Sequence, residues 1–213
     1  MFGAVHMANS FHRGAYLEFR IEKLLRIASC SNGKGVISSE DIQAGDMILF
    51  LGGPIFSENE IPFLAEPTND YFLQIDEDLY LGPSGEVDDY INHSCNPNTG
   101  LVFSENRLGM KAIDFIPKGS EITYDYSTTM HGSWGTMTCN CGAPNCRKKI
   151  INFIEIPVSI QQRYLELGIV PDYIRHHCTQ PIAQRAFSET LRPAISCARG
   201  RAMRRSACRL RRP

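Results

Sequence analysis

Three cysteines lie close together in the second half of this 213-residue chain, in the segment Cys139-Asn-Cys-Gly-Ala-Pro-Asn-Cys146. Their Cys-x-Cys-x4-Cys spacing is typical of zinc sites, but it lacks one thiolate for tetrahedral coordination. Cys95, far upstream in the segment Asn92-His-Ser-Cys95, can supply the fourth ligand. We therefore expect one structural zinc ion bound by Cys95, Cys139, Cys141 and Cys146. The cysteines without such spacing are Cys30, Cys178, Cys197 and Cys208.

The segment around Cys95 is also rich in polar side chains. Taken alone, Asn92-His-Ser-Cys95 is explained by a polar turn with a hydrogen-bonded histidine and a small buried cysteine. It is followed by Asn96-Pro-Asn98, which favours a turn and disfavours a continuing helix. A second unusual segment, Glu121-Ile-Thr-Tyr-Asp-Tyr126, precedes the cysteine cluster. The two segments together indicate a functional site.

Four segments resemble motifs of the SET-domain protein lysine methyltransferases and occur in that family's order. Residues 92–98 resemble the NHSCxPN signature, and residues 121–126 resemble the ELTYDY motif. Residues 32–35 resemble the N-terminal GxG loop, and residues 139–146 resemble the post-SET zinc knot. Each motif alone is a weak signal, but the four in order are not expected by chance. The resemblance implies an enzyme that transfers a methyl group from S-adenosylmethionine to the side-chain amine of lysine.

The resemblance also implies roles for individual residues. Cofactor-binding roles fall on Gly33, Lys34, Gly35, Asn92, His93 and Tyr126. Catalytic roles fall on Tyr126 and Tyr124, and a substrate channel is implied for Phe50, Tyr124 and Tyr126. Many members of the family have Tyr-x-Gly-Glu where this chain has Phe50-Leu-Gly-Gly, so one hydroxyl group is absent here.

The chemistry explains why such residues are needed. A lysine amine with a pKa of about 10.4 must become neutral to attack a sulfonium, and an apolar, aromatic channel favours the neutral form. In the family, the position of Tyr124 tunes how many methyl groups are added. A phenol there can hold the amine or a water molecule where a further methyl group would sit. We therefore expect mainly monomethylation, with some dimethylation.

The hydrophobic pattern predicts a mainly β protein with many short strands and few helices. Strands are predicted at residues 17–27, 36–38, 47–51, 71–75, 79–81, 99–103 and 108–113. One amphipathic helix is predicted at residues 160–167, with Ile160, Tyr164 and Leu167 facing the core. The family resemblance implies a SET fold of small curved sheets with a C-terminal pseudoknot, followed by the zinc knot and a short helical tail.

These patterns divide the chain into five parts. The SET domain is expected at residues 17–130 and the post-SET zinc-binding segment at residues 131–152. A helical segment is expected at residues 153–191. The flanking parts are a flexible N-terminus at residues 1–16 and an Arg-rich, disordered tail at residues 192–213.

The charge distribution bears on partners and location. The tail contains eight Arg and no acidic residue, so the remaining chain has 14 Lys and Arg against 23 Asp and Glu, a net charge of −9. An acidic body suits a lysine-rich protein substrate such as a histone, and it also suits plain solubility. The tail suits either nucleic acid binding or a solvated extension, and the sequence does not indicate an oligomeric state. The start of the chain has no apolar run typical of a signal peptide or membrane span, which predicts an intracellular protein.

Two alternatives to a protein lysine methyltransferase remain. One is a methyltransferase that acts on a non-protein amine or on another side chain, and the other is a catalytically silent module that binds zinc and cofactor. The segment Asp76-Glu-Asp78 is interpreted as an acidic turn, since a paired-carboxylate hydrolase would need an opposing carboxylate that the sequence does not identify.

Overall fold

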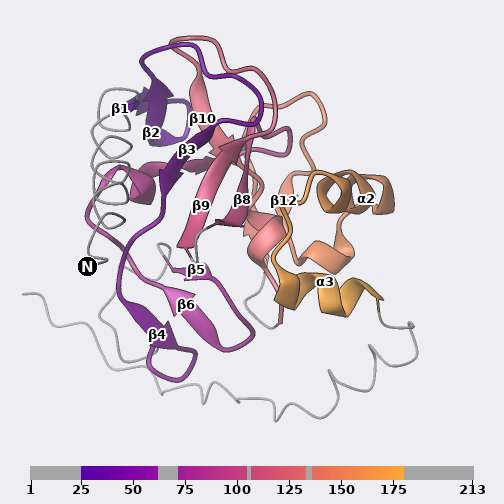
Figure 1. The fold of residues 1–213 in the computed structure, drawn as a ribbon. Coiled ribbons are helices and arrows are strands. Elements are labelled where there is room, and N and C mark those ends of the chain that lie inside the picture. The colour runs from indigo at the N-terminus through magenta and orange to yellow at the C-terminus, as the bar shows by residue number, and fades with distance from the viewer. Residues whose placement is uncertain (1–24, 62–71, 105–106, 133–135, 180–213) are drawn as a thin grey trace, which may run out of the picture. The chain divides into compact units, whose positions relative to one another are not determined.

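The computed structural model describes residues 25–61, 72–104, 107–132 and 136–179. Four small sheets and two α-helices make up this part of the chain (Figure 1). The strands are β1 (Leu25–Cys30), β2 (Gly33–Ser38), β3 (Met47–Phe50), β4 (Ile55–Ser57), β5 (Leu73–Gln74), β6 (Leu79–Leu81), β7 (Asn92–His93), β8 (Thr99–Ser104), β9 (Arg107–Ala112), β10 (Glu121–Tyr124), β11 (Met137–Thr138) and β12 (Lys149–Ile150). The helices are α2 (Val158–Glu166) and α3 (Asp172–Thr179), with short 3₁₀ helices η3 (Val87–Tyr90), η4 (Tyr126–Thr129) and η5 (Phe153–Glu155). The prediction of a mainly β protein with small sheets and few helices is confirmed.

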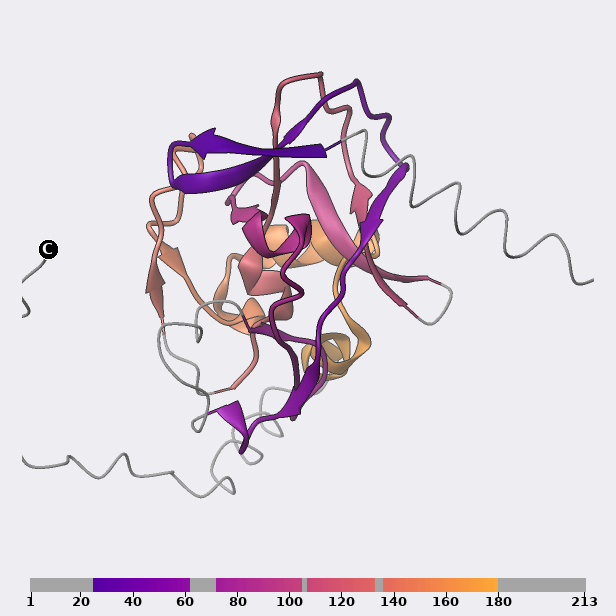
Figure 2. The ribbon, with the colours of Figure 1, turned by 90° about the vertical axis from the view of Figure 1, so that its left-hand side faces the viewer.

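The sheet that carries the candidate site has the order β1-β2-β10-β7. Hairpin β1–β2 is antiparallel, and β10 continues the sheet by pairing antiparallel with β2. Strand β10 then pairs in parallel with β7, with Thr123 opposite Asn92 and Tyr124 opposite His93. A parallel pair needs a crossover between its strands, and here β8 and β9 lie in that crossover. Figure 2 shows the β1–β2 hairpin on the near side, with α2 and α3 behind it.

The other sheets follow the predicted hairpins. Strands β8 and β9 pair antiparallel, and β3 adds to β9. Strands β5 and β6 form the hairpin predicted around the acidic turn at residues 76–78, and β4 pairs with β6. The predicted first strand begins within residues 17–24, which lie outside the described residues, and its described part is β1.

The main apolar core lies among the β-strands. Its fully buried members include Val36, Ile48, Leu101, Met110 and Ile122. A second apolar cluster joins the helices to the strands. Val102 and Ile113 pack against its buried members, which are Phe153, Ile156, Tyr164, Ile169 and Ile174. In Figure 1, α2 and α3 lie to the right of the centrally placed β8.

The predicted helix at residues 160–167 is observed as α2, with one difference in its buried face. Tyr164 is buried and Ile160 is partly buried, as predicted. Leu167 is 36% exposed, because it is the last residue before Gly168, which has a φ of 67° and turns the chain away. Ile169, after that turn, takes the buried position instead. Helix α3 lies within the helical segment expected at residues 153–191, although no separate helix was predicted there.

Candidate active site and metal centre

The pairing of β7 with β10 brings the two polar segments of the sequence together. The Tyr126 backbone N–H donates to Nδ1 of His93 at 3.1 Å, and the two rings lie 5.3 Å apart between centroids. The Tyr124 and Tyr126 rings lie 4.7 Å apart. Asn98 also joins the first polar segment to the second. Its side-chain amide donates to the Glu121 carbonyl at 2.8 Å and accepts from the Thr123 N–H at 2.9 Å. Sequence reasoning assigned no role to Asn98, although its place after Pro97 in a turn was a usable signal.

The loop and strand at residues 32–35 lie against the same segment. The Asn92 amide donates to the Lys34 carbonyl at 3.0 Å and to the Glu121 carboxylate at 2.7 Å. A Cβ atom on Gly35 would meet Glu121 Oε1, the Cys30 sulfur at 2.7 Å and the Asn92 amide at 2.8 Å. Glycine is favoured at position 33 by the backbone conformation, since Gly33 has a φ of 97°. Glycine at position 35 is therefore required by close packing against Asn92 and Glu121, and the role of Glu121 was not predicted.

The two tyrosines make different hydrogen bonds. The Tyr126 hydroxyl donates to the Ile91 carbonyl at 2.8 Å. The Tyr124 side chain is hydrogen-bonded to the Thr129 side chain, and burial, followed by the nearby Tyr126, raises its pKa well above the usual value. The Tyr124 phenol therefore keeps its proton at neutral pH.

His93 is neutral at pH 7. Burial lowers its pKa to about 4, and the Arg147 charge acts in the same direction although Asp125 opposes it. Since Nδ1 accepts from Tyr126, the single ring proton lies on Nε2, which is 3.3 Å from the Cys95 sulfur. The sulfur therefore receives a hydrogen bond from the histidine ring.

The four predicted cysteine ligands form one cluster. The sulfur of Cys139 lies 3.7 Å from that of Cys95 and 3.6 Å from that of Cys146, and the Cys141 sulfur accepts from the Cys95 N–H at 3.4 Å. Zinc–sulfur bonds of about 2.3 Å in a tetrahedron place sulfur atoms about 3.8 Å apart, so these distances fit. The cysteines are free thiols, and the cluster is compatible with one zinc ion.

Two features of the cluster refine this description. The ligand atoms of His93, Cys95, Cys139 and Cys141 lie within 4.8 Å of one another, which makes His93 a geometric alternative to Cys146. The His93 ring, however, already bonds the Tyr126 backbone, which suits it to orient the Cys95 sulfur from outside the ligand set. Burial opposes the Cys141 thiolate, but the N–H groups of Cys95 and Ala143 outweigh burial and lower the Cys141 pKa to about 7. A thiol that deprotonates readily is suited to metal binding.

A buried ion pair lies directly behind the tyrosines. The Asp125 side chain has no exposed surface, and its carboxylate accepts from Arg147 Nη2 at 2.7 Å and from the Tyr164 hydroxyl at 3.1 Å. Arg147 follows Cys146 in the sequence, and its backbone N–H donates to the Cys95 sulfur at 3.4 Å. Sequence reasoning gave neither residue a role. An acidic residue between two site tyrosines was the available signal.

Phe50 lies in a different sheet from the tyrosines. The Arg107 guanidinium lies over its ring at 4.3 Å from the centroid, and a Cβ on Gly109 of β9 would touch the same ring. The structure brings together the predicted cofactor-binding residues, both tyrosines and the four cysteines, whereas Phe50 contacts β9. Its place in a substrate channel stays a prediction.

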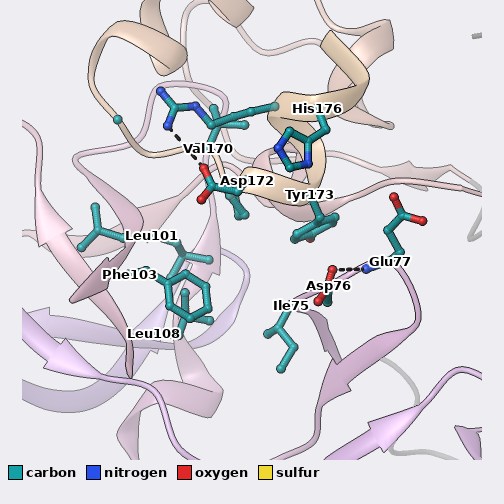
Figure 3. A pocket seen from close by; sticks show the side chains of 14 residues that line it. Ile75, Asp76, Glu77, Leu101, Phe103, Leu108, Val170, Asp172, Tyr173 and His176 are labelled. Atoms are coloured by element: carbon teal, nitrogen blue, oxygen red, sulfur yellow. Dashed lines mark hydrogen bonds and ion pairs between the residues drawn. The ribbon is translucent and has the colours of Figure 1, made fainter. Parts of the chain in front are cut away.

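Two cavities lie near these elements. One of about 190 Å³ is lined by Asn92, His93 and Tyr126 together with Cys139 and Cys141 of the cluster. The other, of about 610 Å³, lies between β8–β9, α3 and the turn after β5, and includes Phe103, Asp172 and Tyr173 (Figure 3). No residue predicted for the site lines the larger cavity, so the smaller one is the candidate cofactor pocket.

The parallel pair β7–β10, the glycine loop beside Asn92 and the adjoining cysteine cluster lie in one region of the chain. The family model described as "SET domain" matches residues 33–127 of this chain. Next to this domain, the cysteine cluster is consistent with a post-SET zinc motif.

Individual relatives are histone methyltransferases by name. The chain is 33% identical over 141 residues to histone-lysine N-methyltransferase ASHH3 of Arabidopsis thaliana, covering 60% of this chain and 38% of that one. It is 32% identical over 148 residues to a human histone-lysine N-methyltransferase described as H3 lysine-36 specific, covering 64% of this chain and 5% of that one. The chain thus spans less than half the length of these relatives.

One similar solved structure is that of KRYPTONITE in complex with mCHH DNA, an H3(1-15) peptide and SAH. Its sequence is 28% identical to this chain, the match covers 60% of this chain and 29% of that one, and the TM-score is 0.47. A likeness of that size is too small to support the fold or the function. Within the described residues, no helix is long and apolar enough to span a membrane.

Proposed function

We propose that this protein is a protein-lysine N-methyltransferase that uses S-adenosylmethionine and contains one structural zinc ion. The observation that carries the proposal is the convergence of Asn92, His93 and Tyr126 at one small cavity beside the cysteine cluster, with Gly35 packed against Asn92. The SET domain match and the named relatives support the same activity. The proposed substrate is a basic protein such as a histone.

S-adenosylmethionine supplies an activated methyl group on a sulfonium. The chain has to place a neutral amine in line with it, and positioning of this kind can contribute about 7–11 kcal/mol to lowering the barrier. In the proposed site, Asn92 fixes the Lys34 carbonyl, and residues 33–35 and His93 line the cofactor's place. Because these groups are already held in place, the chain loses less conformational entropy when the cofactor binds.

Tyr126 and Tyr124 handle the amine in this proposal. The Tyr126 hydroxyl uses its proton on the Ile91 carbonyl, so towards a substrate its oxygen acts as an acceptor and orients the amine through an N–H group. Tyr124 is buried and keeps its hydroxyl at Thr129, which limits the space for additional methyl groups. The finer proposal is therefore monomethylation with some dimethylation.

The predicted division of the chain is part of the same proposal, with the SET domain at residues 17–130 and the post-SET segment at 131–152. Strands β11 and β12 flank the cysteines of the post-SET segment, which supports it as a unit. The helical segment at residues 153–191 is described as far as Thr179. The proposed segments 1–16 and 192–213, including nucleic acid binding by the tail, lie outside the described residues.

A methyl-transfer screen tests the function. Zinc-loaded protein is incubated with radiolabelled S-adenosylmethionine and three substrate groups, namely core histones, basic proteins with blocked lysines, and small amines. The proposal expects label on unblocked histones alone, with Tyr126→Phe reducing turnover by about 10²-fold, the usual cost of losing one positioned hydroxyl. Label on small amines alone would identify a non-protein substrate. Cofactor binding without any transfer would identify a silent binding module.

A further inference from the structure

Arg147 is in an unusual environment for an arginine. It directly follows the cysteine Cys146, yet its side chain is only 9% exposed and points to Asp125, whose side chain is completely buried. Burial opposes the charge on Arg147, but the hydrogen bond and charge of Asp125 outweigh burial and raise its pKa. A buried carboxylate and a buried guanidinium therefore depend on each other.

The backbone at Arg147 belongs to the cysteine cluster. Its N–H donates to the Cys95 sulfur at 3.4 Å, and the next N–H, of Lys148, donates to the Cys146 sulfur at 3.4 Å. Lys148 has a φ of 62°, the only positive value at a non-glycine residue in the described part of the chain. This turn sends the exposed Lys148 outward while Arg147 points inward, and the Lys148 carbonyl accepts from the Cys139 N–H at 3.0 Å.

The bonds of Asp125 extend this link to two other elements. Its carboxylate also accepts from the Ser127 N–H of η4 at 3.1 Å and from the Tyr164 hydroxyl of α2 at 3.1 Å. Asp125 lies between Tyr124 and Tyr126 in the sequence, so its position affects both rings. The Arg147 side chain thus lies where the cysteine cluster, the tyrosine segment and α2 meet.

Part of the guanidinium has no partner in the described structure. Nε and Nη1 of Arg147 are buried and without a hydrogen bond to any described residue, while the Nη2 group bonds Asp125 and Ser127. The Arg147 charge also interacts with the Cys95 sulfur. Metal binding requires the thiolate form of that sulfur, so a loaded cluster adds negative charge beside the same guanidinium.

We propose that Arg147 is a positioning residue that couples the zinc cluster to the catalytic segment, with one guanidinium balancing the buried Asp125 carboxylate and the Cys95 thiolate. This inference rests on the proposed zinc site and methyl transfer. Zinc binding fixes the backbone at residues 146–148, which places the guanidinium. The guanidinium then fixes Asp125, and with it the orientation of the rings of Tyr124 and Tyr126.

The test compares zinc-loaded wild type with Arg147→Met, Arg147→Lys, Asp125→Asn/Arg147→Met and the exposed control Lys149→Met. Three quantities are measured: zinc release to a colorimetric chelator, the thermal unfolding midpoint, and methyl transfer. Arg147→Met should bind one zinc ion yet release it at least tenfold faster, with a lower midpoint and at least tenfold lower turnover. Arg147→Lys should lie between Arg147→Met and wild type, since it keeps the charge and loses the forked geometry.

The double variant distinguishes coupling from simple packing. Removing the Asp125 charge should bring the midpoint back towards wild type, because no unpaired buried charge remains. Zinc release should stay fast, since the positive charge beside Cys95 is still missing. If Arg147→Met behaves like Lys149→Met, or if the unfolding midpoint of the double variant is no higher than that of Arg147→Met, the proposal is wrong. Arg147→Lys and the double variant decide the matter should Arg147→Met fail to fold. The rate of zinc release and the unfolding midpoint are measured without methyl transfer. They therefore test the role of Arg147 even if the proposed methyl transfer is wrong.

Discussion

At the scale of single residues, the site depends on the buried Tyr124 and the partly buried Tyr126, whose phenols have different partners. Tyr126 is tied to the Ile91 carbonyl, and Tyr124 to the Thr129 side chain. We predict that Tyr124→Phe shifts products from monomethyl-lysine to di- and trimethyl-lysine while turnover stays within about threefold, because the hydroxyl leaves and its space opens. Thr129→Val should shift products the same way, more weakly. Intact-mass analysis of a single-lysine peptide checks this, and mainly trimethyl-lysine from wild type would contradict it.

His93 gives a residue-scale prediction about pH. Its pKa is about 4 in the folded protein and about 6.5 in the unfolded chain, so the unfolded state binds a proton first as pH falls. The stability from burying the neutral ring is complete above pH 6.5 and is lost as pH falls towards 4. Between pH 7.5 and 5 we expect a loss of about 2 kcal/mol in unfolding free energy. His93→Gln should lack this component. Equal pH slopes in wild type and His93→Gln would refute the prediction.

At the scale of secondary structure elements, β2 can meet β7 and β10 closely only because residue 35 has no side chain. A Cβ there would lie 2.7 Å from the Cys30 sulfur and 2.8 Å from the Asn92 amide. We predict that Gly35→Ala lowers the unfolding free energy by about 1–3 kcal/mol and weakens cofactor binding at least tenfold. Gly52→Ala is the matched control, since its Cβ would meet only Ser84 at 3.7 Å. Thermal unfolding and calorimetry measure both effects, and equal behaviour of the two variants would exclude the packing argument.

The β11–β12 hairpin illustrates a second element that cannot fold by its own core. Its two strands have two residues each, and the buried residues beside them are Cys95, Cys139 and Ile150. We predict that Cys146→Ser lowers bound zinc to well below one ion per chain and exposes residues 137–150 to amide exchange. The strands around Val36 and Ile122 should stay protected, because their core is apolar. Cys178→Ser, in α3, should change neither. Full zinc occupancy in Cys146→Ser would favour His93 as the fourth ligand.

At the scale of the whole described molecule, α2 and α3 support the segment that carries Tyr124 and Tyr126. The Tyr173 hydroxyl of α3 donates to the Thr129 carbonyl at 2.6 Å, next to the partner of Tyr124. Gly100 of β8 lies so close to Ile169 that an added Cβ would meet three carbons of that side chain, all within 2.8 Å. The helices therefore support the tyrosine segment from behind.

This packing predicts that Gly100→Ala lowers stability by about 1–3 kcal/mol and reduces methyl transfer, although Gly100 touches no predicted site residue. Adding Ile169→Ala should recover part of the loss, since the side chain that collides is gone. Unfolding midpoints and turnover of the single and double variants give the coupling energy. Strict additivity would mean that Gly100 and Ile169 do not share this contact.

The sequence by itself determined the mainly β class, most strand positions and the four cysteines, since these depend on local periodicity and on spacing along the chain. It also identified Asn92, His93, Tyr124 and Tyr126 through motifs. Only the tertiary structure decided the roles of Asp125, Arg147, Asn98 and Glu121. Their function comes from partners between 22 and 52 positions away, brought close by the parallel pairing of β7 with β10 and by the cysteine cluster. Helix α3 and the exposure of Leu167 were also decided there, because burial depends on which surface the chain meets after Gly168 turns it.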